Sequence, residues 1–119
     1  MALFKRKHIP LILSGRKTQT RRTHYHEWRV GRCYAIRDRW FDKPKGHIVI
    51  TRKFKQRLGD ISQADVKKEG YDSIEEFKQA WIAINGTWAP NQIITAYEFI
   101  LNTKTIKKEV KGENNDKKQ

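Results

Sequence analysis

The most informative segment of the chain reads Gly15-Arg16-Lys17-Thr18-Gln19-Thr20-Arg21-Arg22, eight residues without one aliphatic side chain. It follows an apolar stretch at residues 9–13, whose composition and spacing predict one or two helical turns. Pro10 suits the first turn of such a helix, and Gly15 suits the position after its end, where glycine tolerates a positive φ. The segment is too polar for a core element, so we expect it to line a surface or a cleft.

Strand and helix patterns alternate over the rest of the chain. The expected elements are a strand at residues 32–41, a strand at 47–51 that runs into the basic stretch 52–57, a short helix at 63–69, a helix from 73 to about 85, and a strand at 93–101. Turn chemistry at residues 42–46 joins the first two strands as a hairpin. Asp60 or Ser62 can cap the short helix, and Ser73 forms a capping box with Glu76. We therefore predict an α+β fold, a small and mostly antiparallel β-sheet with helices packed outside it.

The length and composition indicate one folded domain. The chain has 119 residues and a mass of 14.2 kDa, but its mean hydropathy of −0.87 is a value that disordered chains also reach. Against disorder, it contains four Trp, four Tyr and five Phe, and its apolar residues fall in periodic segments. We predict a single domain at residues 1–101 and a basic, disordered tail at residues 102–119, which could dock a protein or RNA partner.

Several classes of protein are excluded by the same sequence. No stretch approaches the roughly 20 consecutive apolar residues of a membrane span, and the N-terminus lacks the pattern of a secretory signal. Cys33, the single cysteine, cannot form an internal disulfide or supply a zinc cluster. These features predict a cytoplasmic protein with no membrane association, no metal and no cofactor.

The net charge of +13 is concentrated in one half of the chain. All ten arginines and all four histidines lie in residues 1–57, whose balance is +14, whereas residues 58–101 have a balance of −4. Arginine binds phosphate bidentately and stacks on bases, and aromatic residues such as Trp28 and Tyr34 are interleaved with the arginines. We therefore predict an RNA or nucleotide partner, the alternative being a solvated surface that keeps the protein soluble. The candidate nucleic-acid-binding residues are Arg16, Lys17, Arg21, Arg22, Arg37, Arg39, Arg52 and Lys53.

Metal binding and thiol chemistry are weaker candidates. His24 and His26 would share one face of a strand as a metal pair, but no third ligand stands nearby at a zinc-like spacing. Exposed or phosphate-contacting histidines are expected instead. Cys33 lies in an alternating strand pattern, which predicts a buried and inert thiol.

The tryptophans are candidates either for the core or for stacking on a base. Trp81 lies at helical spacing and is assigned to the core, as is Trp40. Trp28 and Trp88 stay open between the two roles, and stacking on a base would contribute about 1–3 kcal/mol.

The order of these features resembles a known family. The string Gly15-Arg16-Lys17-Thr18-x-Thr20-Arg21, just after a short apolar helix, resembles the signature of the ASCH domain, a family related to the PUA domains that bind RNA. Gly31, Glu69-Gly70 and Tyr97-Glu98-Phe99 agree in order, and the resemblance covers about residues 3–101. It implies a PUA-like β-barrel with short helices beside a cleft, and an RNA or nucleotide ligand in that cleft.

The resemblance also implies two kinds of function. The first is an RNA-binding ASCH domain that uses a basic face and residues 15–22, which is the interpretation we favour from the sequence. The second is an enzyme, because some members of the family are amidohydrolases that remove the acetyl group from N4-acetylcytidine and at least one is a ribonuclease. The catalytic lysine, threonine and glutamate of the amidohydrolases correspond to Lys17, Thr20 and Glu69.

Amide hydrolysis would require a separate chemical role from each of these three residues. A threonine hydroxyl is a poor nucleophile unless a base takes its proton, and a lysine can be that base if burial or nearby cations lower its pKa. Glu69 could donate a proton to the leaving nitrogen if it faces the same cleft. The alternative is a polar loop in which Thr18 or Thr20 caps a turn and Lys17 binds a phosphate.

Overall fold

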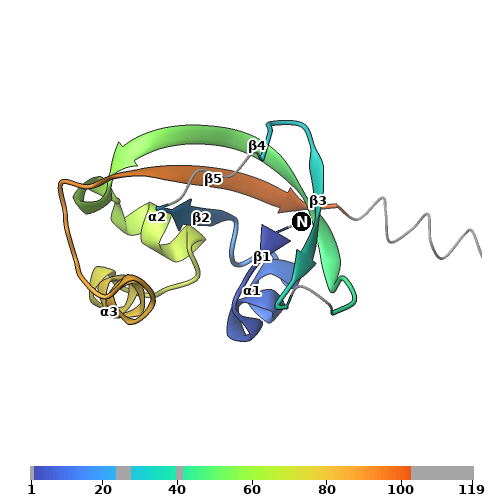
Figure 1. Ribbon diagram of the computed structural model, residues 1–119, viewed down its shortest axis with the longest axis horizontal. Coiled ribbons are helices and arrows are strands. Elements are labelled where there is room, and N and C mark those ends of the chain that lie inside the picture. The colour runs from blue at the N-terminus through green and yellow to red at the C-terminus, as the bar shows by residue number, and fades with distance from the viewer. Residues whose placement is uncertain (1, 24–27, 40–41, 103–119) are drawn as a thin grey trace, which may run out of the picture.

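The computed structural model describes residues 2–23, 28–39 and 42–102, with the helices gathered beneath a long, arched ribbon of two strands (Figure 1). The strands are β1 (Ala2–Leu3), β2 (Gln19–Arg22), β3 (Cys33–Arg37), β4 (Gly46–Arg57) and β5 (Ile93–Leu101). The helices are α1 (Ile9–Leu13), α2 (Gln63–Lys68) and α3 (Ile74–Asn85), with 3-10 turns at Arg6–His8 and Leu58–Asp60. The described strands form one sheet in the order β1-β3-β4-β5-β2, in which the β1–β3 pair is parallel and the other pairs are antiparallel.

The helices begin and end where the capping patterns predicted. The Ser62 side chain accepts a hydrogen bond from a backbone N–H of α2, and the Ser73 side chain accepts one from the Glu76 N–H of α3. Gly70 and Gly86 follow the two helices with φ of +101° and +89°. The predicted hairpin is also present as β3 and β4, although β3 ends at Arg37 and is shorter than expected.

The predicted closed barrel is wrong, because the sheet is open. β1 and β2 stand at its two edges, and among the described residues no backbone pairing joins them. The reason is the length of the edge strands, since β1 has two residues and β2 has four, too few to complete a ring of hydrogen bonds. A side chain spans the gap instead, as the Arg22 Nη2 atom donates to the Leu3 carbonyl at 2.9 Å.

The polar segment at residues 15–22 contains a buried strand, which the sequence analysis did not predict. β2 pairs with β5 along its whole length, and Gln19, Thr20 and Arg21 are each 5% exposed or less. Polar side chains are tolerated inside a protein when their donors and acceptors are paired, and those of β2 are. The segment therefore lines a cleft from within the fold.

Two hydrophobic cores lie on alternate residues of β5. Tyr97 and Phe99 belong to the first core, with Trp28, whereas Ile94 and Ala96 belong to the second. The first core consists of the buried residues Ala2, Phe4, Ile9, Ile12, Trp28, Ile36, Ile48, Ile50, Tyr97 and Phe99. The second consists of Leu58, Ile61, Val66, Phe77, Trp81, Ile94 and Ala96, with Trp88 packed against it. Trp28 and Trp88, for which the sequence left a core role and a stacking role open, thus both pack in the cores. Trp81 is confirmed as a core residue. Trp40 lies outside the described residues.

Cys33 is exposed, so the predicted burial of its thiol is wrong. On β3 it is three residues from Ile36 and thus points to the opposite face, and Ile36 is the residue of that strand that enters the core. The Asn102 Nδ2 atom donates to the Cys33 Sγ atom at 3.3 Å. His24, His26 and the tail beyond residue 102 lie outside the described residues. None of the helices in the described part of the chain is long and apolar enough to cross a membrane.

Candidate functional site

A cavity of about 420 Å³ lies where the N-terminal segment, β2, the end of α2 and α3 come together. One part of its lining is polar and the other part is apolar. The polar lining consists of Lys5, His8, Lys17, Thr20, Arg21, Arg22, Thr23, Glu69, Tyr71 and Asn85, and the apolar lining of Leu3, Phe4, Phe77, Ala80, Trp81 and Ile84. The three residues that the resemblance implied as catalytic, Lys17, Thr20 and Glu69, therefore line one cavity.

Lys17 is buried at the edge of this cavity and its amine is held by Glu69. The Lys17 Nζ atom lies 3.1 Å from Glu69 Oε1 and 2.7 Å from the Glu69 carbonyl oxygen, and the lysine is 2% exposed. The backbone fixes this approach, because a Cβ added at Gly70 would lie 3.0 Å from Leu11 Cδ1 and 3.8 Å from Lys17 Cβ. The glycine after Glu69 therefore lets the end of α2 come close to Lys17.

Burial lowers the pKa of Lys17 below the ordinary value of a lysine. Desolvation of the ammonium is the largest cause, and the nearby guanidinium groups of Arg21 and Arg22 act in the same direction. The Glu69 carboxylate raises the pKa of Lys17 but does not cancel the other effects. The amine of Lys17 is thus more easily uncharged than that of an exposed lysine.

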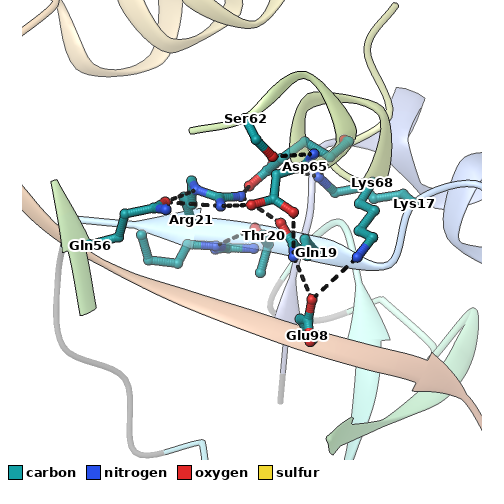
Figure 2. A network of polar contacts seen from close by, with 11 residues as sticks. Lys17, Gln19, Thr20, Arg21, Gln56, Ser62, Asp65, Lys68 and Glu98 are labelled. Atoms are coloured by element: carbon teal, nitrogen blue, oxygen red, sulfur yellow. Dashed lines mark hydrogen bonds and ion pairs between the residues drawn. The ribbon is translucent and has the colours of Figure 1, made fainter. Parts of the chain in front are cut away.

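Arg21 holds the other side of the Glu69 carboxylate. Figure 2 shows Arg21 among its other partners, Gln19, Gln56 and Asp65. Its side chain is fully buried, and Nη1 donates to Glu69 Oε2 at 3.0 Å. Nη1 also donates to Gln19 Oε1 at 2.7 Å, Nη2 donates to Asp65 Oδ2 at 3.2 Å, and Nε and Nη2 both donate to Gln56 Oε1 at 3.0 Å. A guanidinium has five N–H groups, and all five are used here. Arg21 supports Glu69 from inside the protein and is not on the surface where the sequence analysis expected it to bind RNA.

Thr20 is bound by Arg22, the second of the two arginines of β2. The Arg22 Nε atom donates to Thr20 Oγ1 at 3.1 Å, and Thr20 is 5% exposed. The Arg22 guanidinium also lies over two aromatic rings, 4.9 Å from the centroid of Phe4 and 5.2 Å from that of Trp28. Burial lowers the pKa of Arg22, and the Glu69 carboxylate opposes that effect. A guanidinium nevertheless stays charged at physiological pH.

His8 and Tyr71 form a second pair in the cavity, which the sequence analysis missed. The Tyr71 hydroxyl and His8 Nε2 lie 2.9 Å apart. Burial, followed by the charge of Lys17, lowers the pKa of His8 to about 4, and burial, followed by the charge of Glu69, raises the pKa of Tyr71 to about 12. Both side chains are therefore uncharged at neutral pH. They stand 63 residues apart, and no local motif marks either of them.

His8 makes the stability of the fold sensitive to acid. The folded protein holds the imidazole uncharged down to about pH 4, whereas the unfolded chain takes up a proton below about pH 6.5. Protonation therefore favours unfolding, and this contribution to stability is lost as the pH falls from about 6.5 to about 4. We expect His8→Gln, which keeps a hydrogen-bonding side chain but does not titrate, to flatten this loss by about 1–2 kcal/mol, a value reduced for screening by solvent in the cavity that His8 lines. Urea unfolding of both proteins between pH 7 and pH 4 measures it, and parallel stability curves would contradict the assignment.

The other predicted RNA-binding residues are spread over several environments. Arg16, Arg39 and Arg52 are exposed, whereas Arg37 and Lys53 are partly buried. The exposed residues include two that are paired with acidic groups, Arg16 with Asp72 and Arg52 with Glu98. The Arg52 guanidinium also lies 4.2 Å from the centroid of the Phe54 ring. Lys53 Nζ donates to the Trp28 carbonyl at 3.3 Å, and Arg37 Nη1 donates to the Asp42 carbonyl at 3.1 Å.

Solved structures share this architecture. The ASCH domain of Lactobacillus crispatus JV V101 superimposes with a TM-score of 0.68 at 18% identity, over 78% of this chain and 69% of that one. This chain has the ASCH-domain fold. The ASCH protein of Zymomonas mobilis also matches the chain, with a TM-score of 0.61 at 14% identity over 99% of this chain and 82% of the other. A protein of Enterococcus faecalis V583 matches with a TM-score of 0.57 at 20% identity, over 80% and 69% of the two chains.

The expectation of an ASCH domain is thereby confirmed at the level of the fold. No family model and no curated protein matches the sequence. In this fold the segment 15–22 is divided. Lys17, Thr20, Arg21 and Arg22 line the cavity, whereas Gly15 and Arg16 are exposed.

Proposed function

We propose that this ASCH domain hydrolyses the amide of an acylated nucleobase in the cavity, with N4-acetylcytidine, free or within RNA, as the substrate class. The observation that carries the proposal is the Lys17 Nζ atom, buried 3.1 Å from Glu69 Oε1 in the cavity that Thr20 also lines. A volume of about 420 Å³ is within the usual range of small-molecule sites. The apolar lining from Phe77, Ala80 and Trp81 suits the flat face of a base, and the polar lining suits its amide.

Lys17 is the proton carrier in this proposal. An uncharged amine has two N–H groups and one lone pair, and the two N–H groups match the two acceptors that Glu69 offers to Nζ. The lone pair is then free to accept the Thr20 hydroxyl proton while Oγ1 attacks the acyl carbonyl carbon. The C–N bond breaks, the base nitrogen leaves with the proton that Lys17 accepted, and the acyl group remains on Thr20 as an ester. Water that Lys17 deprotonates then cleaves the ester, and Thr20 regains its proton.

Glu69 positions Lys17 in this scheme. The resemblance implied that Glu69 donates a proton to the leaving nitrogen. Both of its carboxylate oxygens, however, already accept hydrogen bonds, one from Lys17 and one from Arg21. We therefore propose that Glu69 orients the amine and that Lys17 carries the proton in both directions.

Removal of the nucleophile tests the proposal. We expect the purified protein to release acetate from N4-acetylcytidine, and we expect Thr20→Val, which keeps the shape of the side chain, to lower kcat/KM by at least about 100-fold. The matched control is Thr18→Val, because Thr18 lies on the same segment but does not line the cavity. Turnover that survives Thr20→Val would rule out this mechanism.

RNA binding is the second candidate function, favoured by the exposed arginines of the basic half. Arg39 and Arg52 are exposed, and the Arg52–Phe54 stack resembles the contacts that bases make with proteins. We expect binding of single-stranded RNA whose log K falls with log salt by about 0.7 per phosphate neutralised, and a smaller slope in Arg39→Gln and Arg52→Gln. Filter binding across a salt series measures both. A protein that binds no RNA at low ionic strength would contradict this function without affecting the hydrolytic one.

A further inference from the structure

In the cavity the Arg22 side chain donates a hydrogen bond to the Thr20 hydroxyl oxygen. Arg22 belongs neither to the predicted catalytic set nor to the hydrogen bonds that hold Glu69. We propose that Arg22 is a positioning residue that orients the Thr20 hydroxyl and stabilises the negative charge that Oγ1 acquires. The catalytic role of Arg22 rests on the proposed hydrolytic function. The electrostatic effect of Arg22 on the side chain at position 20 does not.

The direction of the hydrogen bond between Arg22 and Thr20 restricts where the Thr20 hydroxyl proton can point. A guanidinium has donors and no acceptor, so at 3.1 Å Arg22 Nε must donate and Thr20 Oγ1 must accept. The hydroxyl proton therefore cannot point at Arg22 and must point elsewhere. This bond leaves the proton available to a base on another side of Oγ1, and Lys17 lines the same cavity.

The Arg22 guanidinium is anchored by contacts with residues outside β2. Nη2 donates to the Leu3 carbonyl of β1 at 2.9 Å, and the guanidinium lies over the buried rings of Phe4 and Trp28. Three groups outside β2 thus hold the guanidinium in place. A positive charge that is fixed before the reaction stabilises a developing anion without having to rearrange, and in a partly buried site it is screened less than in water.

The alternation of β2 divides the work between its two arginines. Successive side chains of a strand point to opposite faces, so Arg22 shares a face with Thr20 and Arg21 shares one with Gln19. The hydrogen bonds follow that division, since Arg22 binds Thr20 and Arg21 binds Gln19 and Glu69. One arginine therefore holds the carboxylate and the other holds the hydroxyl.

A thiol at position 20 reports on Arg22 without any substrate. We would introduce Thr20→Cys in a Cys33→Ser background, because Cys33 is the only native cysteine and is exposed. The pH dependence of iodoacetamide alkylation then gives the pKa of the introduced thiol. We expect Arg22→Gln to raise that pKa by about one unit or more, since it removes the cation next to the thiolate, and Arg22→Lys to raise it by less. The other charged or titratable groups that line the cavity with position 20 are the same in every variant; they are Lys5, His8, Lys17, Arg21, Glu69 and Tyr71.

The control and the outcomes separate this inference from the proposed function. Arg29→Gln removes an exposed arginine outside the cavity and is expected to leave the thiol pKa unchanged. A thiol pKa that Arg22→Gln does not move in a folded variant would overturn the inference, and Arg22→Lys answers the same question if Arg22→Gln does not fold. On the otherwise unmodified protein with N4-acetylcytidine, Arg22→Lys should lower kcat by about 30-fold or more with KM within about threefold, because an ammonium cannot keep both the Nε and the Nη2 contacts. If Thr20→Val leaves turnover intact, the hydrolytic proposal fails while the thiol result stands.

Discussion

Replacement of Arg21 by methionine is expected to lower the free energy of unfolding by about 3–5 kcal/mol, the range measured when one partner of a buried ion pair is removed. Methionine fills a similar volume but donates no hydrogen bond. Glu69, Asp65, Gln19 and Gln56 would each lose a donor inside the protein, and the Glu69 carboxylate would keep Lys17 alone. A buried acceptor without a partner bears the full cost of its lost hydration.

Urea unfolding of matched variants measures this loss. Arg29→Met removes an exposed arginine, so it is expected to change the free energy of unfolding by no more than about 0.5 kcal/mol. A double-mutant cycle that combines Arg21→Met with Glu69→Gln isolates the pair, and we expect the two losses not to add. If Arg21→Met and Arg29→Met cost the same, the buried network is not what holds β2 in the sheet.

The composition of β2 explains why this strand was not predicted from the sequence. Strands are recognised by apolar residues that alternate with polar ones, and residues 19–22 contain no apolar side chain. Their burial depends on partners at Gln56, Asp65, Glu69 and Glu98, which are 35 to 79 residues away in the chain. Elements whose signals are local, such as the Ser62 and Ser73 caps, were predicted correctly.

The candidate site was predictable only in part, for the same reason. Lys17 and Thr20 stand in one short string, but Glu69 is 52 residues from Lys17, and spacing alone did not bring them together. The resemblance to ASCH domains placed Glu69 in the same set as Lys17 and Thr20, and in the structure Lys17 and Glu69 are in contact. The open sheet could not be foreseen from the resemblance, because it follows from the short lengths of the edge strands β1 and β2. Had β2 been recognised, its alternation alone would have separated the roles of Arg21 and Arg22.

Replacement of Lys17 is expected to give the largest loss of activity, a fall in kcat/KM of about 10³–10⁴-fold on N4-acetylcytidine in Lys17→Met. The amine must be uncharged to accept the Thr20 proton, so the rate of the wild type rises with pH as Lys17 loses its proton. Because burial lowers the pKa of Lys17, the midpoint of this rise should lie below the ordinary lysine value of about 10.4. Lys67→Met, on the exposed surface of α2, is the matched control and should retain the activity and the pH profile of the wild type.

Lys17→Arg distinguishes a base from a phosphate-binding residue. An arginine keeps the positive charge and binds phosphate at least as well as lysine, but it does not give up its proton at any pH where the protein is folded. If Lys17 only binds a phosphate, as the alternative interpretation of residues 15–22 holds, Lys17→Arg should retain most of the activity. If Lys17 is the base, Lys17→Arg should be as inactive as Lys17→Met, and the rise of the rate with pH should disappear. The buried contact of 3.1 Å with Glu69 favours the second outcome, because a negatively charged carboxylate next to the amine repels a phosphate.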